Sequence, residues 1–138
     1  DFLGQFCDNL LTVDSDVIFK HNWIEKIYNN KEINKFKKPI ILTGYNSISH
    51  KIKEDKGEYF IKESLGGCNM CFNSDIYFNI LRYMFISYKW DKLIQNYFVK
   101  NGIIICTKPS QIEHIGYESS GHRKNQKKNI SFDKSIDF

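Results

Sequence analysis

Two aspartates that are one residue apart follow a short apolar run near the start of the chain. Asp14 and Asp16 come directly after residues 9–13, whose apolar character predicts a buried strand. In α/β sheets, ligands bind just beyond the carboxyl ends of strands. Carboxylate oxygens suit Mg²⁺ or Mn²⁺, which take further ligands from water and substrate phosphates. The pair therefore predicts a cation site that neutralises a diphosphate. A simple polar turn is the alternative, because aspartate commonly bonds its own backbone.

Strands and helices alternate along the rest of the chain. Apolar runs predict further strands at residues 40–43, 58–61, 68–72 and 103–106. Residues 46–57 are polar and rich in lysine, and we expect a loop there. The alternation predicts an α/β fold with a mixed β-sheet flanked by helices.

Three helices are predicted from the spacing of apolar residues, at residues 23–28, 74–84 and 91–101. Ser74 is the expected N-cap of the second helix, and Gly102 is the expected C′ residue that stops the third. The third helix is expected to bury four apolar side chains, which are Leu93, Ile94, Tyr97 and Phe98.

The composition fits one folded domain. The chain has 138 residues, of which 41% are hydrophobic, so a packed core is expected and wholesale disorder is not. It contains no alanine and is rich in lysine, asparagine and isoleucine, which we interpret as coding bias. The net charge of +4 is therefore weak support for a nucleic-acid partner, although it suits an anionic ligand.

The sequence contains no apolar run long enough to predict a transmembrane segment, and no signal peptide is recognisable. We therefore expect a cytoplasmic protein, or one peripheral at a membrane, with its four cysteines reduced. Cys68 and Cys71 form one C-x-x-C pair, whereas a structural zinc site usually needs two. A redox pair would usually lie in a βαβ unit, so two buried thiols are the favoured interpretation.

Four segments, taken in chain order, resemble the GT-A glycosyltransferases of the Asp-x-Asp type (family 2-like). Residues 11–19, with Trp23 after them, resemble the strand that delivers the Asp-x-Asp motif and the helix that follows it. Residues 66–72 resemble the small-residue segment that lines the donor-sugar and acceptor pocket. Trp90-Asp91 resembles the segment with the catalytic base, and residues 109–116 resemble the closing P-S-x-x-x-H-x-G stretch.

This resemblance implies a GT-A fold and a metal-dependent enzyme. The enzyme would transfer a sugar from a nucleotide-sugar donor, such as a UDP- or GDP-sugar, to a hydroxyl of a carbohydrate or glycan acceptor. Mn²⁺ or Mg²⁺ would be the cofactor. A single catalytic base would imply inversion at the anomeric carbon.

By the same resemblance, Asp14, Asp16 and His114 would serve the metal, with Asp16 its most direct ligand. Asp91 would be the base that takes the proton from the acceptor hydroxyl. The alternative role of Asp91 is to stabilise the start of a helix through the helix dipole. His114 could equally be a structural histidine.

Asp14, Gly66, Gly67 and Trp90 would contact the donor or the acceptor. The two glycines could instead make a turn, and Trp90 could be a core or rim aromatic.

In this family roughly a hundred residues that bind the nucleotide precede the Asp-x-Asp motif, whereas thirteen residues precede Asp14 here. We therefore expect residues 1–116 to be the metal- and acceptor-binding half of a catalytic domain. Residues 117–138 would be a polar, basic tail that is mobile or docks weakly. His122 and Arg123 in this tail could cover the diphosphate, although a solvated tail is the simpler interpretation.

Three other functions stay open. A haloacid-dehalogenase-type phosphatase also starts with a strand and Asp-x-Asp, but Val17-Ile18 replaces the Gly-Thr that follows there. A basic module for nucleic acid or carbohydrate would use two lysine clusters, Lys35, Lys37, Lys38 and Lys124, Lys127, Lys128. The third possibility is a transferase remnant that binds sugar without turnover.

Overall fold

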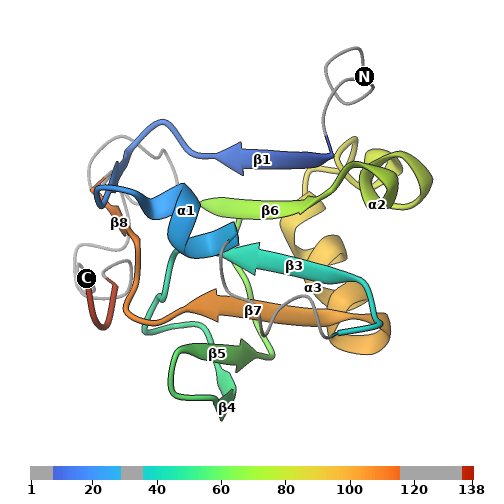
Figure 1. Cartoon of the computed structure of the whole chain (residues 1–138). Coiled ribbons are helices and arrows are strands. Elements are labelled where there is room, and N and C mark those ends of the chain that lie inside the picture. Colours follow the sequence, from blue (N-terminus) through green and yellow to red (C-terminus); the bar gives the residue numbers. More distant parts are fainter. Residues whose placement is uncertain (1–7, 29–35, 116–134) are drawn as a thin grey trace.

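The computed structural model describes residues 8–28, 36–115 and 135–138. Their strands are β1 (Asn9–Val13), β2 (Val17–Phe19), β3 (Ile40–Thr43), β4 (Ile52–Asp55), β5 (Tyr59–Lys62), β6 (Asn69–Asn73), β7 (Ile103–Thr107) and β8 (Ile112–His114). Their helices are α1 (Trp23–Tyr28), α2 (Ser74–Asn79), the 3₁₀ turn η3 (Leu81–Tyr83) and α3 (Trp90–Asn101). The expectation of an α/β fold with a mixed sheet is confirmed (Figure 1).

Within the described residues, six strands form one sheet in the order β1-β6-β3-β7-β5-β4. β3 and β7 are parallel, and the other neighbouring strands are antiparallel. It follows that β1, β3 and β7 all run in the same direction, as their arrows show in Figure 1. Their carboxyl ends meet at one edge of the sheet, which we call the carboxyl edge.

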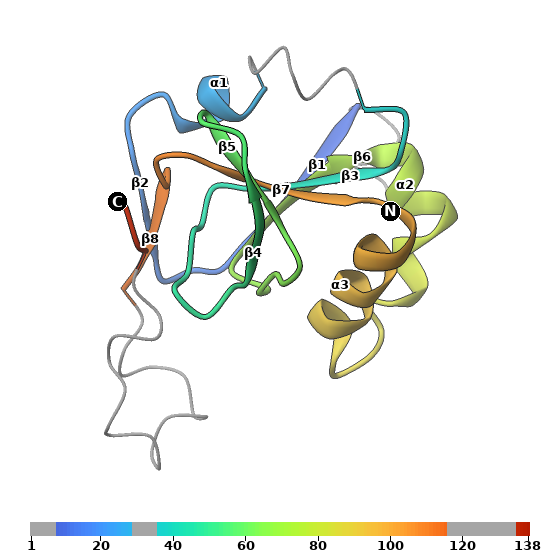
Figure 2. The same cartoon turned by 90° about the horizontal axis from the view of Figure 1, so that it is seen from below.

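Side chains alternate between the two faces of the sheet, as the period of two in a strand requires. Ile41 and Ile104 point to the face covered by α2 and α3, where they join a core with Phe98 of α3. Their neighbours Leu42 and Ile105 belong to a second cluster on the opposite face. Figure 2 shows α2 and α3 together on one side of the sheet and α1 on the other.

A second, two-stranded sheet lies beside the carboxyl edge, where β2 and β8 pair antiparallel (Figure 2). Its register places Val17 opposite His114 and Phe19 opposite Ile112. Phe19 stacks on Trp23 of α1 with 4.4 Å between ring centroids. This small sheet therefore connects the residues after β1 to the residues after β7.

Two predictions about strands are wrong. β1 spans the predicted residues but is an edge strand, with Leu11 and Val13 each 39% exposed. The predicted loop at residues 46–57 contains β4, whose four residues are all exposed. An exposed edge strand needs no apolar alternation, so its sequence resembles that of a loop.

The second helix differs from prediction at both ends, and the third buries only part of its predicted face. The N-cap of α2 is Asn73, whose side chain accepts a hydrogen bond from the Asp75 amide at 2.8 Å, and not Ser74. The helix ends at Asn79, and η3 follows where a continuous helix to residue 84 was expected. On α3, Ile94 and Phe98 are buried as predicted, whereas Leu93 is 42% exposed.

Gly102 ends α3, but not in the left-handed conformation of a C′ glycine. It is extended, with φ −134°. A Cβ atom at this position would lie 2.5 Å from the Pro39 carbonyl oxygen and 2.6 Å from the Phe98 ring. Glycine is required here because the helix end packs directly against the start of β3.

The last four residues dock on the domain. Ser135 forms a β-bridge with Ser47, and its amide donates to the Glu113 carboxylate. The Asp137 carboxylate accepts from the Ser110 amide and from the Asn46 side chain. The end of the predicted tail is therefore anchored beside β8, while its residues 117–134, with His122 and Arg123, lie outside the described residues. No helix in the described part of the chain is long and apolar enough to cross a membrane.

Candidate functional site

Residues 14–16, which we call the acidic loop, connect β1 to β2 at the carboxyl edge. The Asp14 amide donates to the Cys68 carbonyl at 2.9 Å, which continues the β1–β6 ladder by one residue. At the other end of the loop, the Ile115 amide donates to the Asp16 carbonyl at 2.8 Å. Both ends of the acidic loop are therefore fixed by backbone hydrogen bonds, one to each sheet.

The buried side chain of Asn69 connects the ends of two strands beneath this loop. Its carbonyl oxygen accepts from the Gly44 amide at 2.8 Å, directly after β3. Its amide donates to the Thr12 carbonyl in β1 at 3.4 Å. Asn69 is 0% exposed, so its side chain has little access to water. Its two hydrogen bonds to the backbone replace those that water would otherwise make.

His114 meets the acidic loop from β8. Its Nε2 atom lies 3.3 Å from Oδ1 of Asp16. The β2–β8 register causes this contact, because Val17, the residue after Asp16, is paired with His114. The histidine is 7% exposed, and its Nδ1 atom is buried without a hydrogen-bond partner among the described residues.

The electrostatics of Asp14 reflect several charges gathered at one place. The pKa of Asp14 is raised, mainly because neighbouring atoms partly desolvate its carboxylate. The residue as a whole keeps access to solvent. The charges of Asp16 and Asp91 raise the pKa further, whereas His114 lowers it. The negative charges of Asp16 and Asp91 both act on the Asp14 carboxylate, so a cation bound beside it would be favoured.

Trp90 and Asp91 approach the same region from the start of α3. A Cβ atom at Gly67 would lie 3.1 Å from the Trp90 ring and 3.7 Å from the Asp91 side chain. Phe85 stacks on Trp90 with 4.9 Å between centroids, so Trp90 is a half-buried aromatic held between Phe85 and Gly67. The absent side chain of Gly67 is what lets α3 come this close.

Gly66 faces a histidine that the sequence does not single out. A Cβ atom at Gly66 would lie 3.0 Å from the His50 ring. Burial and, to a smaller extent, the nearby Lys62 ammonium together lower the pKa of His50 to about 4. Lys62 is itself buried and donates to the His50 carbonyl at 3.2 Å. Gly66 thus allows close packing against His50, and a contact with a donor sugar stays a prediction.

The structure brings most of the predicted site residues to the carboxyl edge. Asp14, Asp16 and His114 form its centre, Asp91 is close enough to affect Asp14 electrostatically, and Gly67 connects this group to Trp90. Gly66 is adjacent in sequence but packs against His50.

Cys68 is the neighbour that sequence reasoning missed. Ligand atoms of Asp14, Cys68 and His114 lie within 4.8 Å of one another. Both thiols of the C-x-x-C pair are buried as expected, but Cys68 adjoins the acidic loop, while Cys71 is in mid-strand. The position of Cys68 follows from the pairing of Val13 with Asn69. Because the two strands are antiparallel, Cys68, which precedes Asn69, lies opposite Asp14, which follows Val13.

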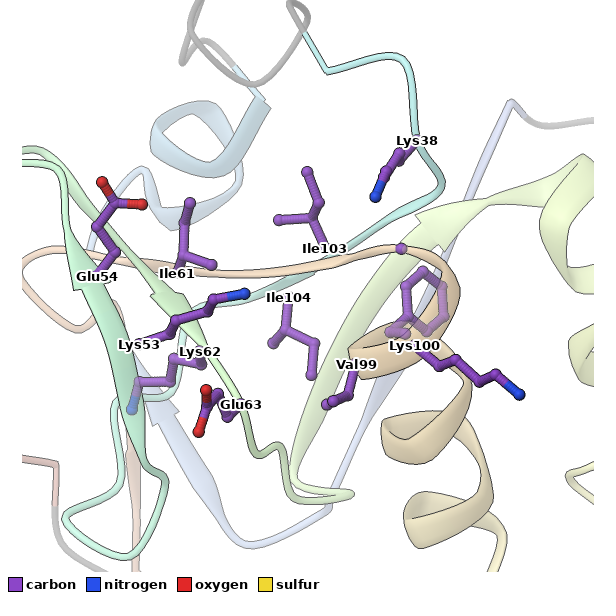
Figure 3. A pocket seen from close by; sticks show the side chains of 12 residues that line it. Lys38, Lys53, Glu54, Ile61, Lys62, Glu63, Val99, Lys100, Ile103 and Ile104 are labelled. Atoms are coloured by element: carbon purple, nitrogen blue, oxygen red, sulfur yellow. The ribbon is translucent and has the colours of Figure 1, made fainter.

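A pocket of about 290 Å³ lies at the opposite edge of the sheet, between β4, β5 and the end of α3. Figure 3 shows the side chains of Lys38, Lys53 and Lys100 around it, with Ile103 and Ile104 projecting to opposite sides of β7. None of the predicted site residues lines it. Its basic rim consists of surface lysines, so the carboxyl edge is the better candidate for chemistry.

Comparison with known protein families finds no family model that matches this chain, and comparison with curated proteins finds no match.

Proposed function

We propose that this chain is the metal- and acceptor-binding part of a glycosyltransferase with a GT-A fold, which transfers a sugar from a nucleotide-sugar donor to an acceptor hydroxyl. The observation that carries the proposal is the convergence of Asp14, Asp16, His114 and Asp91 at the carboxyl edge. These residues come from three separate segments of the chain. A polar turn after β1 would not need a buried histidine and a third carboxylate beside it.

The donor atoms suit a divalent cation. Asp14 and Asp16 provide hard carboxylate oxygens, and His114 provides an imidazole nitrogen 3.3 Å from Asp16. These three residues would hold Mn²⁺ or Mg²⁺. A cation bound there would neutralise the negative charge that develops on the departing nucleoside diphosphate.

The protein's own groups have distinct tasks in this proposal. The Asp91 carboxylate accepts the proton of the acceptor hydroxyl while the hydroxyl oxygen forms its bond to the anomeric carbon. The bond from that carbon to the diphosphate oxygen breaks at the same time, so one displacement inverts the configuration. Trp90 and Gly67 form the wall beside Asp91 and limit where the acceptor can lie.

The fold is compatible with this assignment, because ligands of α/β sheets bind beyond the carboxyl ends of strands. The acidic loop follows β1, and His114 lies after β7, on the short strand β8. Both segments lie at the edge where β1, β3 and β7 end. The pocket at the other edge offers lysines but no comparable group of acids and histidine.

The test measures the nucleoside diphosphate released from UDP- and GDP-sugars by the purified protein with Mn²⁺, with and without glycan acceptors. We expect Asp16→Ala to abolish release, whereas Asp75→Ala, which changes an exposed aspartate on α2, leaves it unchanged. Equal release by wild type and Asp16→Ala would refute the proposal. A phosphorylated Asp14 after incubation with a phosphate ester would indicate a phosphatase instead.

A further inference from the structure

Three potential metal ligands of different chemical type meet at the acidic loop. An oxygen of Asp14, the sulfur of Cys68 and a ring nitrogen of His114 lie within 4.8 Å of one another. Asp14 lies directly after β1, Cys68 lies directly before β6, and His114 is the last residue of β8. A separation of this size lets one ion contact all three after small side-chain adjustments, because metal–ligand bonds are about 2.0–2.3 Å long.

The two softer ligands are buried. Cys68 is 6% exposed and His114 is 7% exposed. The Nδ1 atom of His114 has no hydrogen-bond partner among the described residues, which is uncommon for a buried ring nitrogen. A metal ion bound through Nδ1 would satisfy this atom.

The backbone holds the cluster together before any ion arrives. The Asp14 amide donates to the Cys68 carbonyl at 2.9 Å, which fixes the two residues opposite each other. The β2–β8 pairing fixes His114 beside Asp16. Little reorganisation would therefore be needed to bind an ion, in contrast to a site made from loop residues alone.

We propose that the Cys68 thiolate is a ligand of the metal at this site, which therefore selects thiophilic transition ions such as Zn²⁺ and Co²⁺ over Mg²⁺. The inference rests on the proposed function for the presence of a cation at the acidic loop. Thiolate and imidazole ligands favour zinc-like ions, whereas carboxylates alone suit magnesium. On binding, the Cys68 thiol loses its proton to solvent, and no electron transfer is involved.

Co²⁺ provides a readout that does not depend on catalysis, since a thiolate bound to Co²⁺ produces a sulfur-to-metal charge-transfer absorption band. The experiment titrates the full chain with Co²⁺ under reducing conditions and then displaces the ion with Zn²⁺. We expect the band in the wild type, its loss in Cys68→Ala, and its loss or weakening in His114→Gln. Cys71→Ala is the matched control, because Cys71 is also buried but lies within β6, away from the cluster, and the variant should keep the band.

Each outcome decides between the inference and the proposed function. A band that persists in Cys68→Ala, or Co²⁺ binding without any band, would overturn the role of Cys68 and leave a carboxylate metal site standing. No binding of Co²⁺, Zn²⁺ or Mn²⁺ by the wild type would overturn both. A Cys68-dependent band in a protein that releases no nucleoside diphosphate would support the inference and count against the glycosyltransferase.

Discussion

The Nε2 atom of His114 lies 3.3 Å from Oδ1 of Asp16, although the two residues are near opposite ends of the domain sequence. The contact arises because β2 and β8 pair next to it, with Val17 opposite His114. A short sheet of two strands thus brings the residues after β1 together with those after β7. The site is assembled by strand pairing, and its geometry follows from that register.

Removing the charge of Asp91 should reduce transfer far more than it weakens metal binding, because Asp91 acts on the cation site only through its charge near Asp14. We expect Asp91→Asn to lower the transfer rate by about 100- to 10,000-fold, the usual contribution of a general base. The measurement is the transfer rate at saturating donor and acceptor, together with the Mn²⁺ affinity from calorimetry. The control is Asp75→Asn, which changes an exposed aspartate in the first turn of α2. It should match the wild type in transfer rate and in Mn²⁺ affinity. Unchanged transfer in Asp91→Asn would exclude it as the base.

Adding a methyl group at Gly67 should displace the start of α3. The new Cβ would lie 3.1 Å from the Trp90 ring, so the ring must give way, and we expect Asp91, the next residue, to move with it. We expect Gly67→Ala to lower transfer by about 100-fold, because small displacements of catalytic groups have effects of that size.

Gly57→Ala is the contrasting variant for Gly67. Gly57 has φ +85° in the β4–β5 turn, and a Cβ there would have no atom within 4 Å. We expect it to lose about 1 kcal/mol of stability from backbone strain but to keep full transfer activity. Loss of transfer in Gly57→Ala and not in Gly67→Ala would contradict the assignment of the site.

The neutral state of His50 should make stability depend on pH. Its pKa in the fold is about 4, lowered by burial and by Lys62 from the ordinary value of 6.5. Between these two values the unfolded chain binds more protons, so stability is complete above the higher value and falls as the pH drops toward the lower one. The loss reaches about 3 kcal/mol.

Urea denaturation of His50→Gln between pH 4 and 7 tests this effect. We expect the variant to lose most of the decrease that the wild type shows over this range. His21→Gln, which changes an exposed histidine, should retain it. The same pH dependence in His50→Gln and wild type would contradict the prediction.

Gly102 should tolerate no side chain. An added Cβ would lie 2.5 Å from the Pro39 carbonyl oxygen, which is a backbone atom and cannot rotate away. We expect Gly102→Ala to lose about 2 kcal/mol or more of stability, a cost typical of overpacking. Denaturant unfolding measures it, and a free energy of unfolding equal to that of wild type would show that α3 moves freely relative to β3.

Local sequence patterns predict the positions of most central elements. Residues 40–43 form β3 as expected, and β5, β6 and β7 lie within one residue of their predicted bounds. These strands carry isoleucine, leucine or phenylalanine that the core requires. β4 is missed because all of its residues face solvent, so nothing in its composition distinguishes it from a loop.

The site is harder to predict, since it depends on pairing over long distances. The motifs indicate Asp14, Asp16, Asp91 and His114 singly, but no local pattern shows that β2 pairs with β8. Cys68 has no local signal of its own, because its place opposite Asp14 follows only from the β1–β6 register.

Asn69 illustrates how such a fold can mislead a genetic screen. Its side chain joins Thr12 in β1 to Gly44 after β3, so it sets the spacing of the strand ends below the acidic loop. Loss-of-function variants at this buried amide would accumulate beside those of the carboxylates, although Asn69 need never touch a ligand. An active site mapped only from loss-of-function variants would therefore include supporting residues such as Asn69 along with those that bind the ligand.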